Sequence, residues 1–278
     1  MASLPLLRYD ENRRAHRFAR TVATYALSVS LFLLMWELTA LYANLSLLPS
    51  PVETLEALVK LWTQGDLMTG LSLGDYVRSS LATFVKGFLL ALAVTVPLGL
   101  LVGYFRFLRE LTNPLIEMMR PVAPIVWAPF FLVMFGYQVG PMLVVFVGVF
   151  FPMVTNVMFG VMKVEPEWLD AAKTLGASDT QVFLKVIVPA SLPYVMNGVR
   201  IGLGIGWMCI VAAEFYASPV GGIGFLLTQY ADMGYWSGVF AAVFVIGVLG
   251  ILTVGTAGRL HALLSRRMGM EAESGPRR

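Results

Sequence analysis

Apolar positions along the chain gather into runs that are long enough to cross a bilayer. An α-helix needs about 20 mostly apolar residues to span the hydrocarbon core. The pattern therefore predicts an all-α membrane protein with about six transmembrane helices. They cover residues 22–42, 80–104, 120–136, 139–161, 189–216 and 236–258.

The third of these runs is the least regular. It is short and contains Pro121, Pro124 and Pro129. Proline lacks the backbone N–H and clashes with the preceding turn, so this helix is expected to be kinked or partly broken. In a membrane, such a break is tolerated where neighbouring helices or a cavity satisfy the freed backbone groups.

Composition agrees with the spans. Of the 278 residues, 58% are hydrophobic and only 13% are charged, against an ordinary share of about 25% charged. The single cysteine, Cys209, excludes an internal disulfide. His16 and His261 have no metal-ligand spacing with any other residue, and no nucleophile–base arrangement stands out. We therefore expect no metal site and no enzyme activity on this chain.

The basic residues predict the orientation. All of the Lys and Arg residues except Lys60, Arg78, Lys86 and Arg200 lie in the segments that the six spans place on one side. The positive-inside rule makes that side the cytoplasm and puts both termini there. The first apolar run, at about 20 residues, is longer than the core of a signal peptide, so we expect it to be a retained helix.

These patterns divide the chain into five parts. Between the first two spans, Ser50 to Glu53 form a capping box with proline at the first helical position, which predicts an amphipathic helix outside. The parts are a basic cytoplasmic tail (1–21), a first transmembrane helix (22–42), an extracytoplasmic segment (43–79), a transmembrane domain (80–258) with a cytoplasmic hairpin (162–188), and a cytoplasmic tail (259–278).

The hairpin is the most polar interruption of the apolar pattern. Residues 165–189 read EPEWLDAAKTLGASDTQVFLKVIVP. Pro166 suits a first helical turn, Gly176 a left-handed C-cap, and Ser178 with Gln181 a second capping box. Pro189 predicts a break before the fifth span. The small residues at the tip are Ala171, Ala172, Gly176 and Ala177.

Two interpretations of this hairpin remain open from its pattern alone. It can be an ordinary surface hairpin between two spans, in which Trp168, Ala172 and Leu175 share one apolar stripe. It can also be a docking element, because a connection between two spans can be far shorter and small residues let another surface approach closely. Its length and double capping favour docking.

The hairpin also resembles a known motif, the EAA loop of ABC importer permeases, which reads E-A-A-x3-G-x9-I-x-L-P. Asp replaces Glu, and two valines replace Ile and Leu. The matching residues are Asp170, Ala171, Ala172, Gly176, Val186, Val188 and Pro189.

Further motifs resemble the nitrate/sulfonate/taurine branch of this family, the binding-protein-dependent transport inner-membrane components. The resemblance runs from about Ser80 to the end of the last span. Thr83 stands where that branch usually has arginine, and Ala123 where it often has proline. The matching stretches include Pro97-Leu98-Gly99, Trp127-Ala128-Pro129, Gly198-Val199-Arg200, Ala213-Glu214 and Gly222-Ile223-Gly224.

The resemblance implies a type I importer fold in a bacterial inner membrane. Its partners would be a pair of ATP-binding subunits, an extracytoplasmic solute-binding protein, a second permease copy, most simply a homodimer, and the lipid bilayer, with no nucleic acid. ATP and magnesium would bind the partner ATPase, and this chain has no Gly-Lys pair from which a P-loop could be built. The residues implied to couple to that ATPase are Asp170, Ala171, Ala172, Gly176, Ala177, Ser178 and Pro189.

Charges within the spans point to a pathway. Arg200 and Glu214 lie 14 residues apart on the fifth span, about 21 Å along a helix and within about 40° of one direction. Both can therefore face one path, where a cationic Arg200 would suit a small anionic solute. Arg200 can instead be a structural bridge between helices, and Glu214 can close an interface near the outer gate. Trp127, Phe131 and Met208 are further pathway candidates, with simple packing as the alternative.

Two other functions make different predictions. A secondary transporter or channel would need inverted repeats or acidic residues near the middle of the membrane. No convincing repeat is present, and Glu37 and Glu214 both lie toward the outer side. An intramembrane enzyme would need clustered His, Asp or Ser inside the spans, which the sequence does not contain.

Overall fold

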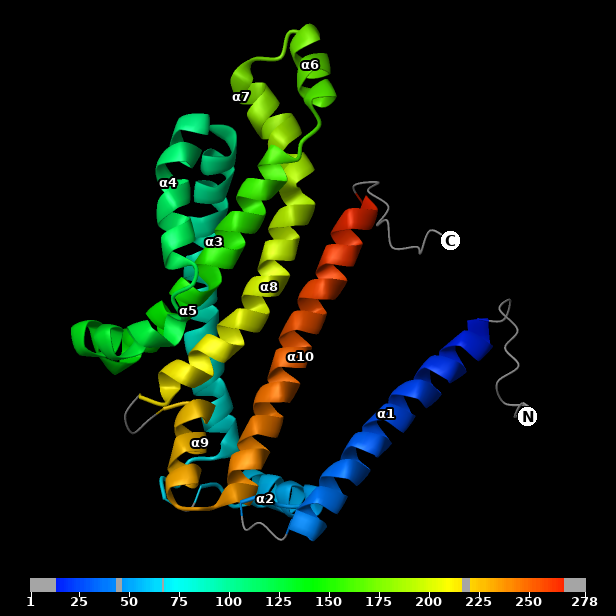
Figure 1. The fold of residues 1–278 in the computed structure, drawn as a ribbon, viewed down its shortest axis with the longest axis vertical. Coiled ribbons are helices and arrows are strands. Elements are labelled where there is room, and N and C mark those ends of the chain that lie inside the picture. The colour runs from blue at the N-terminus through cyan, green and yellow to red at the C-terminus, as the bar shows by residue number, and fades with distance from the viewer. Residues whose placement is uncertain (1–13, 44–46, 67, 217–220, 268–278) are drawn as a thin grey trace.

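The computed structural model describes residues 14–43, 47–66, 68–216 and 221–267, and these are helical with short connections (Figure 1). Residues 1–13 of the predicted N-terminal tail and 268–278 of the C-terminal tail lie outside the described residues. The elements are α1 (Arg14–Ala43), α2 (Pro51–Thr63), α3 (Leu73–Tyr104), α4 (Arg106–Met119), a 3-10 turn (Pro124–Trp127), α5 (Ala128–Met162), α6 (Pro166–Thr174), α7 (Asp179–Val182), a π turn (Phe183–Ile187), α8 (Val188–Glu214), α9 (Ile223–Asp232) and α10 (Trp236–Arg267).

Five helical stretches in the described part of the chain are long and apolar enough to cross a membrane. The predicted spans 120–136 and 139–161 correspond largely to one of them, which covers 124–162 and turns sharply at Gly136 (φ 74°). The predicted partial break at the prolines is confirmed, because residues 120–123 are not helical and Pro124–Trp127 form a 3-10 turn. The second break, at Gly136, was not predicted, and its positive φ is easy only for glycine. With the short arm before Gly136, the stretches match the expectation of about six membrane helices.

Two helices were not predicted from the sequence. α4 follows α3 directly, and the Arg109 Nη1 donates to the Gly103 carbonyl at 3.1 Å at the end of α3. α9 lies between α8 and α10 in the chain (Figure 1). α3 also begins earlier than predicted, at Leu73, because Ser72 and Asp75 form a capping box.

The core lies where α3, α5 and α8 pack together. Glycines let α3 approach α5 closely: a Cβ on Gly99 would lie 2.7 Å from the Val157 Cβ, so only glycine fits. Elsewhere on α3, Phe84 stacks on Trp207 of α8 with ring centroids 4.7 Å apart. Such close helix packing is typical of membrane bundles, where small residues bring backbones together.

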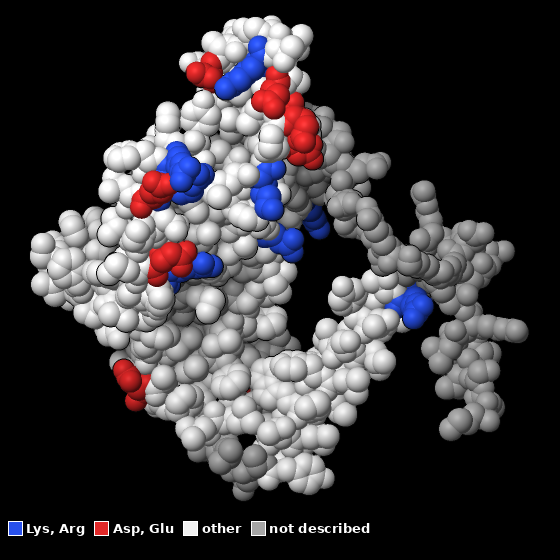
Figure 2. All heavy atoms as spheres, turned by 45° about the horizontal axis from the view of Figure 1, so that its top comes forward, with Lys and Arg blue, Asp and Glu red and all other residues white. Residues whose placement is uncertain are grey.

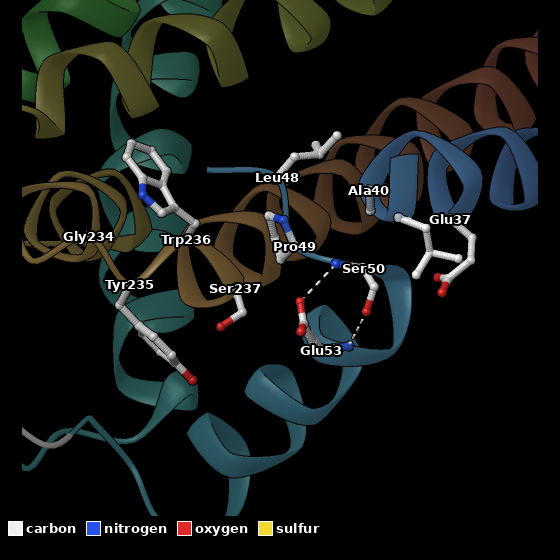
Figure 3. A pocket seen from close by; sticks show the side chains of 11 residues that line it. Glu37, Ala40, Leu48, Pro49, Ser50, Glu53, Gly234, Tyr235, Trp236 and Ser237 are labelled. Carbon is white, nitrogen blue, oxygen red and sulfur yellow. Dashed lines mark hydrogen bonds between the residues drawn. The ribbon is translucent and has the colours of Figure 1, made fainter. Parts of the chain in front are cut away.

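α1 leans away from the other helices (Figure 1), and its apolar side chains are exposed in this chain. It is tied in near its C-terminal end, where the Trp36 Nε1 donates to the Pro49 carbonyl at 2.9 Å and the ring packs on Phe240. Next to it, the predicted capping box of α2 is confirmed. The Glu53 N–H donates to the Ser50 Oγ at 3.1 Å, and the Ser50 N–H to the Glu53 Oε2 at 2.9 Å (Figure 3).

A buried carboxylate organises the loop between α2 and α3. Asp66 is 2% exposed and accepts hydrogen bonds from the Thr69 hydroxyl at 2.6 Å, Tyr76 at 3.0 Å and Tyr230 at 3.0 Å. Burial alone would raise the pKa of Asp66, but the hydrogen bonds from Thr69, Tyr230 and Tyr76 outweigh it and hold the pKa below its ordinary value of 3.8. The ionised carboxylate therefore ties α3 and α9 to this loop.

We expect Asp66→Asn to lower the melting temperature of the purified protein at pH 7. On going to acid pH, the melting temperature of the variant should fall less than that of the wild type. A depressed pKa means that the carboxylate stabilises the fold above its unfolded pKa, and that this contribution is lost as pH falls through the folded pKa. Removing the charge-assisted hydrogen bonds should cost about 1–3 kcal/mol at pH 7. Thermal unfolding in detergent at pH 7 and pH 3 measures both terms. Equal melting temperatures for wild type and variant at pH 7 would contradict it.

Candidate functional site

The hairpin at 162–188 is built by strong local signals. α6 begins at Pro166 and ends in a Schellman motif around Gly176 (φ 81°). The Ala177 N–H donates to the Ala172 carbonyl at 3.0 Å, and the Gly176 N–H to the Lys173 carbonyl at 2.9 Å. The predicted left-handed cap at Gly176 is therefore confirmed.

The second arm of the hairpin starts with the predicted capping box. The Ser178 N–H donates to the Gln181 Oε1 at 2.9 Å, and the Gln181 N–H to the Ser178 Oγ at 3.4 Å. With α6 capped at its end and α7 at its start, the orphan backbone groups at the turn are satisfied. The hairpin is consequently a well-defined shape rather than a loose connection.

The predicted break at Pro189 is wrong. The helix runs from Asp179 to Glu214 as one 36-residue stretch, and a π turn at Phe183–Ile187 precedes the proline. In this turn the Val188 N–H donates to the Phe183 carbonyl. Pro189 has no backbone N–H to donate. The wider π turn before it lets the chain stay helical without that hydrogen bond. The hairpin's second arm and the α8 span are therefore mechanically continuous.

Most of the predicted coupling residues lie on the surface of this hairpin. Ala172 and Ala177 are half-buried and pack with Leu169 beside Val161 and Val182. This small cluster anchors the hairpin to the spans. The exposed members of the predicted set are Asp170, Ala171, Gly176, Ser178 and Pro189.

The apolar stripe predicted on the first arm of the hairpin is only partly covered. Ala172 is half-buried, but Trp168 is 49% exposed and Leu175 is 88% exposed. Leu175 sits at the C-cap, where the helical periodicity that defined the stripe has ended. An exposed leucine next to small residues marks the tip as a surface that another protein can cover. The sequence feature that could have indicated this exposure is the place of Leu175 directly before Gly176, the glycine that ends α6.

Charged residues gather at the hairpin end of the molecule, while the sides of the spans are nearly free of them (Figure 2). Among the charges near the hairpin, Lys173 and Asp179 form an exposed ion pair at 3.6 Å across the turn. This distribution fits a cytoplasmic end that projects into water and apolar sides that face lipid or protein.

α8 carries one exposed face. Asn197, Arg200, Gly204 and Met208 recur every three or four residues, which places them on one side of the helix. Met208 is 73% exposed, Arg200 is exposed, and a Cβ on Gly204 would meet nothing within 4 Å. A guanidinium in the middle of a spanning helix costs about 2.5–3.5 kcal/mol on insertion scales. This face therefore favours a wet cavity or a partner over lipid.

The expectation that Glu214 shares this face with Arg200 needs correction. Glu214 is 3% exposed, and its Oε2 accepts from the Ser80 Oγ and from the Gly224 N–H, both at 2.9 Å. The Ser80 Oγ in turn accepts from the Ile223 N–H at 2.8 Å. The start of α9 packs over Glu214, a contact that the rotation of α8 alone could not reveal. Glu214 thus joins α3, α8 and α9.

The predicted aromatic candidates lie on a different element. Trp127 stacks on Phe131 with ring centroids 6.0 Å apart, and Phe131 packs against the central core. Both precede the break at Gly136. Among the described residues, neither ring contacts the exposed face of α8, so of the pathway candidates only Arg200 and Met208 lie together.

At the outer end, a cavity of about 550 Å³ opens where α1, α2 and the start of α10 meet (Figure 3). Glu37, Ser50 and Glu53 line one side, and Tyr235 and Ser237 line the other. No group of three or more metal-binding side chains occurs among the described residues.

Comparison with known proteins identifies the fold and its relatives. The profile of the family described as "Binding-protein-dependent transport system inner membrane component" matches residues 95–269. The putative ABC transporter permease protein MJ0413 of Methanocaldococcus jannaschii is 38% identical over 80% of this chain and 84% of its own length. The bicarbonate transport system permease protein CmpB of Synechocystis is 33% identical over 80% and 81%. The nitrate import permease protein NrtB of the same genus is 29% identical over 88% and 90%.

Solved structures agree on the fold. An inward-facing structure of the MetNI methionine ABC transporter matches 69% of this chain and 95% of its own with a TM-score of 0.60 at 19% identity. A bacterial alginate ABC transporter matches 94% and 99% with a TM-score of 0.57 at 14% identity. At these identities the likeness concerns the fold alone.

Proposed function

The chain belongs to the family of binding-protein-dependent transport system inner membrane components. From this premise we propose how it binds a separate ATPase and which solutes it transports. It is an ABC importer permease subunit, a membrane protein with a transport role. In our proposal the hairpin at 162–188 docks on a separate ATPase, and the exposed face of α8 lines the path of a small anionic solute.

The observation that carries the docking proposal is the continuity between the hairpin and α8. A push on the tip near Gly176 acts on α7, which continues without a break into the 36-residue stretch that crosses the membrane. Transmission of a movement needs a rigid element with two arrangements. The capped hairpin supplies the rigidity, and the exposed tip supplies the contact surface.

The anionic solute is supported by Arg200 and by the relatives. A fixed positive charge on the exposed face of α8 attracts anions and repels cations. Two similar permeases are described by their bicarbonate and nitrate solutes. We propose a small oxyanion of that kind, which includes sulfonates such as taurine.

The remaining parts of the proposed assembly follow the family. Two copies of this chain would enclose the path, a pair of ATP-binding subunits would hold ATP and magnesium, and an extracytoplasmic protein would deliver the solute. This chain would then hydrolyse nothing itself. Its place would be the bacterial inner membrane with both termini in the cytoplasm, as its basic residues predict.

The test is to purify the tagged chain from gently solubilised membranes of its native host. We expect an ATP-binding subunit to co-purify, and the reconstituted complex to take up labelled nitrate or bicarbonate only when ATP is present on the cytoplasmic side. Mass spectrometry and vesicle uptake measure the two points. Uptake driven by an ion gradient alone, with no ATPase bound, would instead support a secondary transporter.

A further inference from the structure

Asn197 lies one turn before Arg200 on the exposed face of α8, and a neighbouring helix holds it. Its Nδ2 donates to the Asn156 Oδ1 of α5 at 2.9 Å. The Asn156 Nδ2 donates in turn to the Pro152 carbonyl at 2.8 Å. The Asn197 amide is therefore fixed from behind by α5 and is exposed at the front.

The two side chains have hydrogen-bond donors left over. An asparagine amide carries two N–H donors and one acceptor, and a guanidinium carries five donors and no acceptor. Asn156 uses one N–H of Asn197. Within the described part of this chain, the second N–H of Asn197 and every N–H of Arg200 have no hydrogen-bond partner. The face thus offers a positive charge with a neutral donor beside it.

Hydrogen-bond donors without a partner are significant here because these side chains lie deep in a spanning helix. At 1.5 Å per residue, Arg200 lies about 18 Å from the start of α8 and about 21 Å from its end. It lies near the middle of the spanning helix, where unsatisfied donors and a bare charge are costly. Such groups face water, a partner or a ligand.

We infer that Asn197 and Arg200 form one oxyanion-binding site on the path, with Asn156 as the residue that positions Asn197. The planar guanidinium can donate to two oxygens of a small oxyanion, and the free Asn197 N–H can donate to a third. Because the amide and guanidinium both donate, the site selects acceptors such as nitrate, bicarbonate or a sulfonate. This inference rests on the proposed function and deepens it by naming a second solute contact.

The test measures anion binding directly, with the purified transporter complex in detergent. The probes are sodium nitrate, bicarbonate, sulfate and taurine, each compared with sodium chloride at the same ionic strength and pH. A ligand that binds the folded state raises the melting temperature with concentration. We expect at least one probe to stabilise the wild type.

We expect Asn197→Leu to weaken that binding about tenfold or more, as the loss of a hydrogen bond to a charged group predicts. Arg200→Gln should weaken it at least as much. Asn156→Leu leaves Asn197 in place but unanchored and should have a smaller effect. Asn113→Ala removes an exposed asparagine on α4 and should leave binding unchanged.

Each alternative result is distinct. Unchanged anion affinity in Asn197→Leu, with weakened binding in Arg200→Gln, would overturn the shared site and leave the transport function standing. No stabilisation of the wild type by any probe would overturn the oxyanion site altogether. If Asn197→Leu does not assemble, Asn197→Ala is measured in the same way, and wild-type affinity in that variant counts against the inference. Failure of the proposed function shows separately, as absence of a co-purified ATPase.

Discussion

Replacing Gly176 with proline is expected to abolish ATP-dependent uptake while the protein remains in the membrane. Gly176 has a φ of 81°, whereas proline is confined to about −65°. Proline also removes the N–H that donates to the Lys173 carbonyl at 2.9 Å. The Schellman turn cannot form, so the tip around Leu175 should lose its shape. Uptake should fall to background, and the ATP-binding subunit should no longer co-purify.

A milder change and a matched control sharpen this prediction. A Cβ at Gly176 would meet nothing within 4 Å, so Gly176→Ala adds only left-handed strain of about 1–2 kcal/mol and should reduce uptake partly. Gly234 also has a positive φ with open space around it, but it lies after α9 at the outer end. Gly234→Pro should keep the ATPase bound. Normal uptake and a bound ATPase in Gly176→Pro would disprove the docking role of the hairpin.

The hairpin was predictable because its determinants are local. Ser178 and Gln181 form a capping box within one turn, and Gly176 ends α6 by its own conformational freedom. Both were visible in the order of residues alone. The break at Pro189 was predicted wrongly, because a π turn, which has no sequence signal of its own, accommodates this proline.

Contacts between residues far apart in the sequence were not predictable in the same way. Glu214 meets Ser80 from 134 positions away, and Asp66 meets Tyr230 from 164 positions away. No local pattern announces such partners. The position of Glu214 on α8 could be predicted from the sequence, but its burial comes from α9, a helix whose existence had not been inferred. Arg200 stayed on the exposed face because nothing in the described chain packs over it.

Glu214→Ala is the second change for which we expect a large effect, and here the loss should be in stability. Without the carboxylate, the Ser80 hydroxyl and the Gly224 N–H each lose a partner in a buried place. An unsatisfied buried group costs about 1–3 kcal/mol, so the two together should cost about 2–6 kcal/mol. At about 2–4 °C per kcal/mol for a chain of this size, the melting temperature in detergent should fall by roughly 10 °C.

Two further variants separate this joint from a role in the pathway. Glu214→Gln keeps an acceptor oxygen and should retain most of the stability. Gly222→Ala should be as harmful as Glu214→Ala, because a Cβ there would collide with Ser80 and Glu214. If Glu214 instead lines the path of an anion, Glu214→Ala would alter uptake at unchanged melting temperature. Since α9 begins on this carboxylate and meets α3 and α8 there, we expect the thermal effect.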